Sequence, residues 1–117
     1  MAVQMKRAYE RAQRADGYRV LIDRIWPRGV SKDAARLDEW ARELAPSTEL
    51  RRWFGHDPAR FDEFRRRYRD ELASHEEKLR ELRRRGRTGT LTLVYAARDT
   101  EHNDAVVLAE LLRRRSP

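Results

Sequence analysis

The segment Arg19-Val-Leu-Ile-Asp-Arg-Ile-Trp-Pro-Arg-Gly29 begins with apolar, β-branched residues and ends with charged ones. The continuous apolar run Val20–Ile22 is typical of a strand in a sheet that is covered on both faces. Pro27 and Gly29 then end the strand, because proline and glycine favour turns. A carboxylate, two guanidinium groups and an indole lie within the six residues Asp23–Arg28. Packing alone does not require charges there, so the segment predicts both a buried strand and a candidate site.

The rest of the chain alternates between strand-like and helix-like patterns. Apolar and β-branched runs predict strands, whereas apolar residues three and four positions apart predict helices. The predicted strands are Val3–Ala8, Tyr18–Asp23 and Thr90–Ala97. The predicted helices are Lys32–Arg36, Ser47–Phe54, Pro58–Ala73, His75–Arg85 and His102–Arg114. The segment Leu37–Ala45 is ambiguous, although its apolar residues have helical spacing. This order indicates an α/β fold with a small, mainly parallel sheet of three to four strands flanked by helices.

Some helix boundaries carry clear local signals. Asp57 followed by Pro58 predicts a helix start, because aspartate caps helices and proline suits their first turn. Ser74 followed three residues later by Glu77 resembles a capping box for the next helix. The residues expected to end that helix are Gly86 and Gly89.

A chain of 117 residues has the length of one domain, and we expect residues 1–117 to form a single compact unit. Charged residues make up 40% of the chain, and such a fraction can indicate disorder. Three Trp, four Tyr and three Phe, together with the apolar strands, predict instead a folded domain with a highly charged exterior.

The chain contains no cysteine, which excludes disulfides, thiolate nucleophiles and thiolate metal sites. No apolar run approaches the roughly 20 residues of a membrane span. The first residues also lack the apolar core of a signal peptide. We therefore expect a cytoplasmic protein that does not associate with membranes.

The net charge of +7 has two interpretations. In the first, nucleic acid binds clustered cations through its phosphates. The runs that would bind it are Arg65–Arg67, Arg83–Arg85 and Arg113–Arg115. In the second, the charge is compositional, because all but three of the 27 basic residues are Arg, as is typical of GC-rich genomes. No RNP sequence, zinc finger or basic zipper is present, so nucleic-acid binding is the second hypothesis.

The first candidate site follows the strand that ends at Asp23. Arg24 and Arg28 could each bind a carboxylate or phosphate through paired hydrogen bonds. Asp23 could orient one of these guanidinium groups or act as a base, and Trp26 could line the site. The alternative is an ion pair that only fixes the turn, with Trp26 packed over it.

Two other clusters could join this site. His56 directly precedes a predicted helix start, where free backbone N–H groups would also face a ligand. Histidine is the natural acid or base near neutral pH. The second strand end carries Tyr95, Asp99 and Asn103, and the Asn103 amide could point at a ligand. Asp99 could instead cap the last helix, with Thr100 as the competing cap.

Four segments, in order along the chain, resemble a known family: Arg19–Gly29, Ala45-Pro-Ser47, Trp53-Phe-Gly-His-Asp-Pro58, and Leu91–Asp99 with Asn103. They are similar to the YeaO-like branch of the domain-of-unknown-function 488 (DUF488) family, and the match covers nearly the whole chain. The resemblance implies a small single-domain bacterial or archaeal α/β protein, but no activity, because the family is uncharacterised. Other branches place a cysteine near the position of Asp99–Asn103, and thiol chemistry does not carry over to this chain.

The leading hypothesis is a small anionic ligand bound where the carboxyl ends of parallel strands meet, with hydrolytic acid–base catalysis as an open possibility. The predicted proton-transfer residues are His56 and Asp23. The predicted ligand-binding residues are Arg24, Trp26, Arg28, Tyr95, Asp99 and Asn103. No phosphate loop, dinucleotide fingerprint or nucleophile elbow is present. No cofactor or metal is expected, because His56 and His102 lack a ligand spacing. The oligomeric state stays open.

Overall fold

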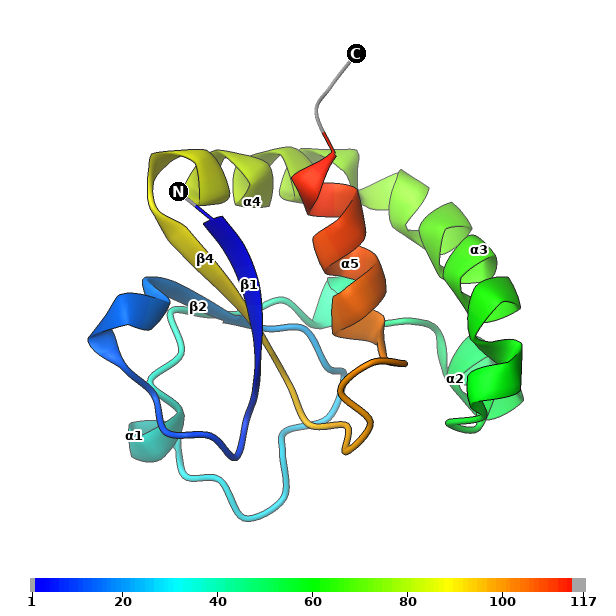
Figure 1. The fold of residues 1–117 in the computed structure, drawn as a ribbon, viewed down its shortest axis with the longest axis horizontal. Helices are drawn as coiled ribbons and strands as arrows, with labels where there is room; N and C mark the ends of the chain where they lie inside the picture. Colours follow the sequence, from blue (N-terminus) through cyan, green and yellow to red (C-terminus); the bar gives the residue numbers. More distant parts are fainter. Residues whose placement is uncertain (1, 115–117) are drawn as a thin grey trace.

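Four parallel strands form the centre of the fold, which a computed structural model describes for residues 2–114 (Figure 1). The strands are β1 (Ala2–Arg7), β2 (Tyr18–Leu21), β3 (Glu39–Trp40) and β4 (Thr90–Tyr95). Their order in the sheet is β1-β4-β2-β3, and all three pairings are parallel. The predicted α/β class with a small parallel sheet is therefore confirmed, and β1 is an edge strand.

The central strand β4 is buried on both faces, as its continuous apolar sequence predicts. Leu91, Leu93 and Tyr95 belong to the main hydrophobic core, on the face covered by helices. Val94 packs on the opposite face with Leu21 of β2. Because side chains alternate along a strand, a slip of one residue would exchange these two faces.

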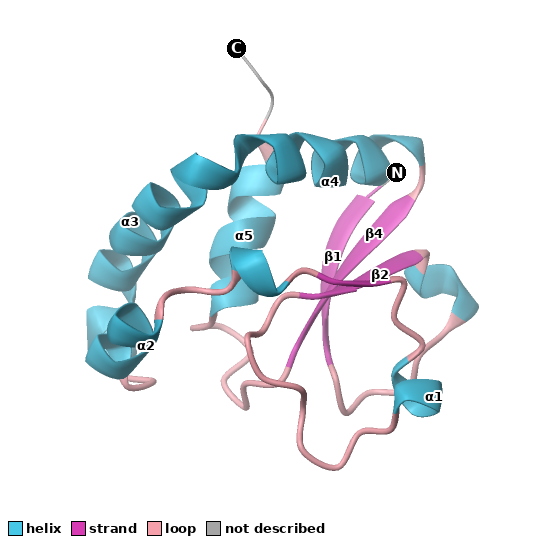
Figure 2. Cartoon of the chain, turned by 180° about the vertical axis from the view of Figure 1, so that it is seen from behind, coloured by secondary structure: helices cyan, strands magenta, loops and turns pink. Residues whose placement is uncertain are grey.

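Two helices lie against the sheet and two lie outside them, whereas the short first helix lies apart from these four (Figures 1 and 2). They are α1 (Lys32–Ala35), α2 (Thr48–Phe54), α3 (Phe61–Leu72), α4 (Glu76–Thr88) and α5 (Asp104–Arg113). Short 3-10 helices cover Arg14–Asp16, Arg42–Leu44, Pro58–Arg60 and Ala73–His75. Helices α4 and α5 contact the sheet, and α3 packs against α5 and α2.

The apolar stripe predicted for the helix after Pro58 is the buried face of α3. Phe61, Phe64, Tyr68 and Leu72 are each at most 5% exposed. The hydroxyl of Tyr68 donates to the carbonyl of Leu44 at 2.6 Å, which satisfies the one polar atom on this face. Spacing of three and four residues therefore identified the correct packing surface.

The segment Leu37–Ala45, which is ambiguous in sequence, does not form the helix that its apolar spacing indicates. It contains strand β3 and the 3-10 turn Arg42–Leu44. The backbone N–H of Ala41 donates to Leu21 at 2.8 Å, and Asp38 exchanges hydrogen bonds with Arg19. This segment pairs with the open edge of β2 and satisfies the backbone groups of that edge. The spacing of apolar residues within the segment gives no information about this pairing.

Two helix boundaries also differ from expectation. No capping box forms at Ser74, whose hydroxyl donates to the carbonyl of Glu71, because the chain passes from α3 to α4 through a 3-10 turn. Gly86 does not end α4 but lies inside it. A Cβ at this position would come within 2.8 Å of Val3, so the glycine allows the helix to approach β1 closely.

A buried ion cluster fixes the turn that leads into β2. Asp16 accepts from the Arg19 guanidinium at 2.7 Å and from the Lys6 ammonium at 3.2 Å. Asp16 and Arg19 are only 2% and 3% exposed. Burial opposes the charge of Asp16, but hydrogen bonds from Gln13 and Lys6 outweigh it and lower the pKa of the carboxyl. The cluster is thus a fully paired buried charge.

We expect the substitution Asp16→Ala to lower the free energy of unfolding by about 3–5 kcal/mol, because it leaves the Arg19 guanidinium buried without its carboxylate. Urea unfolding followed by circular dichroism measures this difference. Asp62→Ala, at a side chain that is 99% exposed, is the matched control and should change stability by less than about 1 kcal/mol. Equal effects of the two substitutions would contradict a structural role for the cluster.

Candidate functional site

The carboxyl ends of β2 and β4 lie side by side, as expected for parallel neighbours. Ile22 donates its N–H to the carbonyl of Val94 at 3.2 Å. One residue further on, the carboxylate of Asp23 accepts from the N–H of Ala96 at 2.9 Å. Asp23 therefore ties together the two strand ends after the regular sheet has finished.

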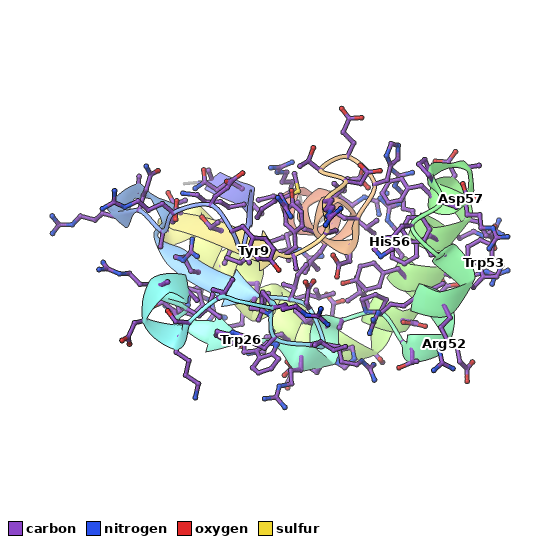
Figure 3. The ribbon with its side chains drawn as sticks, turned by 90° about the horizontal axis from the view of Figure 1, so that it is seen from below. Tyr9, Trp26, Arg52, Trp53, His56 and Asp57 are labelled. Atoms are coloured by element: carbon purple, nitrogen blue, oxygen red, sulfur yellow. The ribbon has the colours of Figure 1, made fainter. Side chains whose placement is uncertain are left out.

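A cavity of about 960 Å³ opens at this edge of the sheet, between the two strand ends and α2. Figure 3 shows this edge from below, with Trp26 on one side and Arg52 and His56 on the side of α2 and α3. Its polar lining consists of Asp23, Arg24, Trp26, Arg28, Thr48, Arg51, Arg52, His56, Arg98, Asp99, Asn103 and Asp104. Its apolar lining consists of Ile25, Pro27, Ala45, Pro46, Phe54, Phe64, Ala96 and Ala97.

The structure brings together most of the residues predicted to form the site. The predicted residues that line the cavity are Asp23, Arg24, Trp26, Arg28, His56, Asp99 and Asn103. Tyr95 is not among the lining residues, because its side chain is 4% exposed and belongs to the main core. Its predicted role in ligand positioning therefore has no support from its location.

Five arginines line the cavity, and all five are exposed. They are Arg24, Arg28, Arg51, Arg52 and Arg98. Within residues 2–114, none of them forms an ion pair or donates a side-chain hydrogen bond to the protein. By contrast, the arginines of α3 and α4 that bind acidic side chains are Arg65, Arg66, Arg67, Arg69 and Arg83. The cavity therefore concentrates guanidinium groups that have no acidic partner in the described chain.

Two carboxyl groups, Asp23 and Asp104, meet at the cavity. Asp104 is in the first turn of α5 and is partly buried. Burial and the neighbouring Asp23 raise the pKa of Asp104 well above its ordinary value. Burial also raises the pKa of Asp23, although the N–H of Ala96, a hydrogen bond from Asp104 and the charge of Arg51 oppose it. The two groups therefore behave as a pair that retains a proton more readily than isolated carboxyls.

The polar side chains of the loop between β4 and α5 mainly form hydrogen bonds within the loop itself. Asp99 accepts from the N–H groups of Glu101 and His102, and the Glu101 hydrogen bond lowers the pKa of this carboxyl most. His102 places Nδ1 2.9 Å from Asp99. The sequence predicts Asp99 or Thr100 as the cap of α5, but the structure shows that Asn103 is the cap. Its amide oxygen accepts from the N–H of Val106 at 3.0 Å.

Asn103 is 3% exposed, and its amide nitrogen donates to the carbonyl of Asp99 at 2.8 Å. Both ends of the amide are thus engaged within the loop. The location of Asn103 at the cavity agrees with the sequence prediction, but its hydrogen bonds show a structural function. It holds the first turn of α5, and therefore Asp104, in place.

His56 is exposed at the cavity and has a left-handed backbone with φ of 57°. A non-glycine residue in this region is uncommon and marks a local constraint. The next residue, Asp57, accepts from the N–H of Ala59 at 3.0 Å and thus acts as the predicted cap. The sharp turn therefore directs the imidazole toward the cavity between two helices.

Trp26 lines one side of the cavity, and its side chain is held in place by neighbouring groups. Its indole N–H donates to the carbonyl of Val30 at 2.6 Å, and its ring meets Trp40 edge-on at 5.4 Å between ring centres. Trp40 in turn donates to the carbonyl of Asp23 at 2.7 Å. The two indoles thus hold the loop after β2 by packing and by hydrogen bonds, and Trp26 lines the cavity at the same time.

Among residues 2–114, no group of three or more His, Cys, Asp or Glu side chains is placed to hold a metal ion. No helix in this range is both long and apolar enough to cross a membrane. The cavity thus offers cationic, carboxyl and aromatic groups but no evident metal centre within the described chain.

The chain belongs to the DUF488 family. Residues 2–116 match DUF488-N3i, described as the inactive DUF488-N3 subclade. The chain is 46% identical over 113 residues to the uncharacterized protein YeaO of Escherichia coli K12, which covers 97% of this chain and 98% of YeaO. It is also 46% identical over 113 residues to the uncharacterized protein Rv3073c of Mycobacterium tuberculosis H37Rv, covering 97% and 95% of the two chains. The comparison with solved structures found no match. The predicted family is therefore confirmed.

Sequence reasoning did not identify Arg51, Arg52 or Asp104 as cavity residues. The two arginines lie on the exposed part of α2, where charged residues are ordinary. Asp104 follows the helix cap, where an acidic residue is also ordinary because of the helix dipole. Only its proximity to Asp23, in the loop after β2, distinguishes Asp104 from a surface residue.

The raised pKa of Asp104 predicts a stability that depends on pH. Above its ordinary pKa of 3.8, the folded protein holds a proton that the unfolded chain releases. The protonated Asp104 contributes its full share to the free energy of unfolding below pH 3.8. This contribution is lost as the pH rises through the higher pKa of Asp104 in the folded protein. We expect Asp104→Asn to raise the melting temperature by about 4 °C or more at pH 8 and less at pH 4.

Scanning calorimetry of the wild type and Asp104→Asn across this pH range measures the difference. The comparison cancels carboxyls with lowered pKa values, such as Asp16 and Asp99, because both proteins contain them. Glu101→Gln, which removes an exposed carboxylate from the preceding loop, is the matched control and should follow the wild type. A pH-independent difference would contradict the paired carboxyls.

Proposed function

We propose that the protein binds a small anionic organic ligand in the cavity at the carboxyl ends of β2 and β4. The five cavity arginines, which lack acidic partners among residues 2–114, carry this proposal. Guanidinium groups bind carboxylates and phosphates through paired, charge-assisted hydrogen bonds. Solvent screens the mutual repulsion of these exposed groups only in part, so a bound anion would lower the repulsion that remains.

The apolar lining supports an organic ligand rather than a free inorganic ion. Phe54, Phe64 and Pro46 line the cavity beneath the arginines, and both phenyl rings are at most 5% exposed. Ligand sites typically combine an apolar wall with a few polar groups and have volumes of roughly 300–1,000 Å³. A cavity of about 960 Å³ can therefore accommodate an anionic group together with a carbon skeleton.

The proposal is limited to binding, in agreement with the description of the subclade as inactive. The chain has no cysteine and hence no thiolate nucleophile. Proton transfer by His56 or Asp23 stays a prediction, to be tested by turnover assays once a ligand is known. Both residues line the cavity and are placed to contact a ligand in either case.

Nucleic-acid binding through the Arg-rich helices is the weaker alternative. Several arginines of the runs in α3 and α4 bind nearby acidic side chains, and Arg113 donates to the carbonyl of Val3. Arg115, the last residue of the third run, lies outside the described residues. Locally paired cations release fewer counterions from a phosphate backbone than unpaired ones. A salt series with short oligonucleotides tests this alternative, which requires a steep loss of affinity with salt.

Arg28→Ala and Arg51→Ala should each weaken the binding of anions by about tenfold or more, because each removes charge-assisted hydrogen bonds. Thermal shift and NMR titration with inorganic phosphate, ethyl phosphate and propionate measure the effect, since ligands that bind the folded state stabilise it by mass action. Arg66→Ala removes an exposed arginine that is paired with Glu63 on α3 and is the matched control.

Two results would argue against the proposal. One is that none of the three anions binds to the wild-type protein at millimolar concentration. The other is that Arg66→Ala weakens binding as much as the two cavity substitutions, which would indicate a non-specific effect of net charge.

A further inference from the structure

We propose that the ligand of this cavity is a zwitterion, whose anionic group binds the arginines and whose amine binds Asp23 and Asp104. The chemical class is that of amino acids and aminoalkyl phosphates. This inference rests on the proposed function, because it assigns the second end of the same ligand. It goes further by stating which of many small anions the cavity selects.

The first observation is that the two carboxyls are incompletely satisfied by the protein. Asp23 accepts one hydrogen bond from the N–H of Ala96, and Asp104 accepts one from the N–H of Ala105. Within the described part of the chain, the side-chain hydrogen bond made by these groups is the one that they share with each other, and no Lys or Arg forms an ion pair with them. Since each carboxylate can accept several hydrogen bonds, acceptor sites remain available at the cavity.

The second observation is the contrast with Asp16. That carboxylate is also buried, but Lys6 and Arg19 compensate its charge. Asp23 and Asp104 instead face each other. Arg51 is near enough to influence Asp23 electrostatically but forms no ion pair with it. The two carboxyls repel each other when both are charged and share a proton instead, whereas an ammonium group placed between them would compensate both charges.

The third observation is that opposite charges line one cavity. Both carboxyls and the five arginines are lining residues of the same space. A purely anionic ligand would gain from the arginines but would meet repulsion from Asp23 and Asp104. A metal ion is a poor alternative, because no third acidic or histidine ligand joins the pair among residues 2–114. A zwitterion satisfies both sets of charges at once.

The test compares ligands that differ only by an amine. Propionate is compared with β-alanine, and ethyl phosphate with phosphoethanolamine, by NMR titration of the full chain at pH 8, where both amines are charged. We expect the amine-containing member of at least one pair to bind about tenfold tighter, as a charge-assisted hydrogen bond provides. The N–H signals of Ala96 and Ala105 should shift more with that member than with the other, because these groups donate to the two carboxyls.

The variants Asp104→Asn and Asp23→Asn should abolish the advantage of the amine while keeping or improving the binding of propionate and ethyl phosphate. This opposite response separates recognition of the amine from general damage to the fold. Glu101→Gln removes one negative charge from an exposed position outside the cavity lining and should behave as the wild type. If a variant does not fold, the ligand pairs on the wild-type protein still decide the question.

Two failures are distinguishable. If the ligands without an amine bind and those with an amine bind no tighter, the zwitterion inference is wrong and the anion site stands. If no member of either pair binds, the proposed anion site fails and the inference fails with it.

Discussion

The parallel pairing of β4 with both β1 and β2 is the constraint on which the rest of the structure depends. It places β4 in the centre, buried on both faces, and orients the carboxyl ends of the strands toward one edge of the sheet. The chain must then leave that edge through loops, whose backbone groups need partners. Asp23 meets part of this need by accepting the N–H of Ala96. The cavity follows from this geometry, since loops diverge where strands end.

The two carboxyl clusters of this domain differ in how their charges are compensated. Asp16, near the amino end of β2, is fully compensated by Lys6 and Arg19 and fixes the entry to the strand. Asp23, just beyond the carboxyl end of the same strand, faces another carboxyl and lines the cavity. Burial is common to both, so the difference lies in the partners. Carboxyls left uncompensated within a cavity are characteristic of binding sites rather than of cores.

The sequence was sufficient to predict the α/β class, the stripe of α3 and seven of the twelve polar residues that line the cavity, because these depend on local spacing and on polar residues at strand ends. It was insufficient for β3, since a two-residue strand is defined by its hydrogen bonds to β2 and not by its own composition. It was also insufficient for Asp104. An aspartate in a first helical turn is ordinary, and only its proximity to Asp23 in the folded chain makes it part of a pair.

The net charge of +7 is a poor guide to function in this protein, because the arginines do not have equivalent surroundings. On α3, Arg66 and Arg67 share the carboxylate of Glu63, and Arg65 binds Glu110 of α5, so these charges are compensated where they stand. The arginines around the cavity have no such partners among residues 2–114. The codon usage of a GC-rich genome would account for the total charge. The fold determines which guanidinium groups remain available to a ligand. The positions without a counter-charge, and not the total, carry the functional argument.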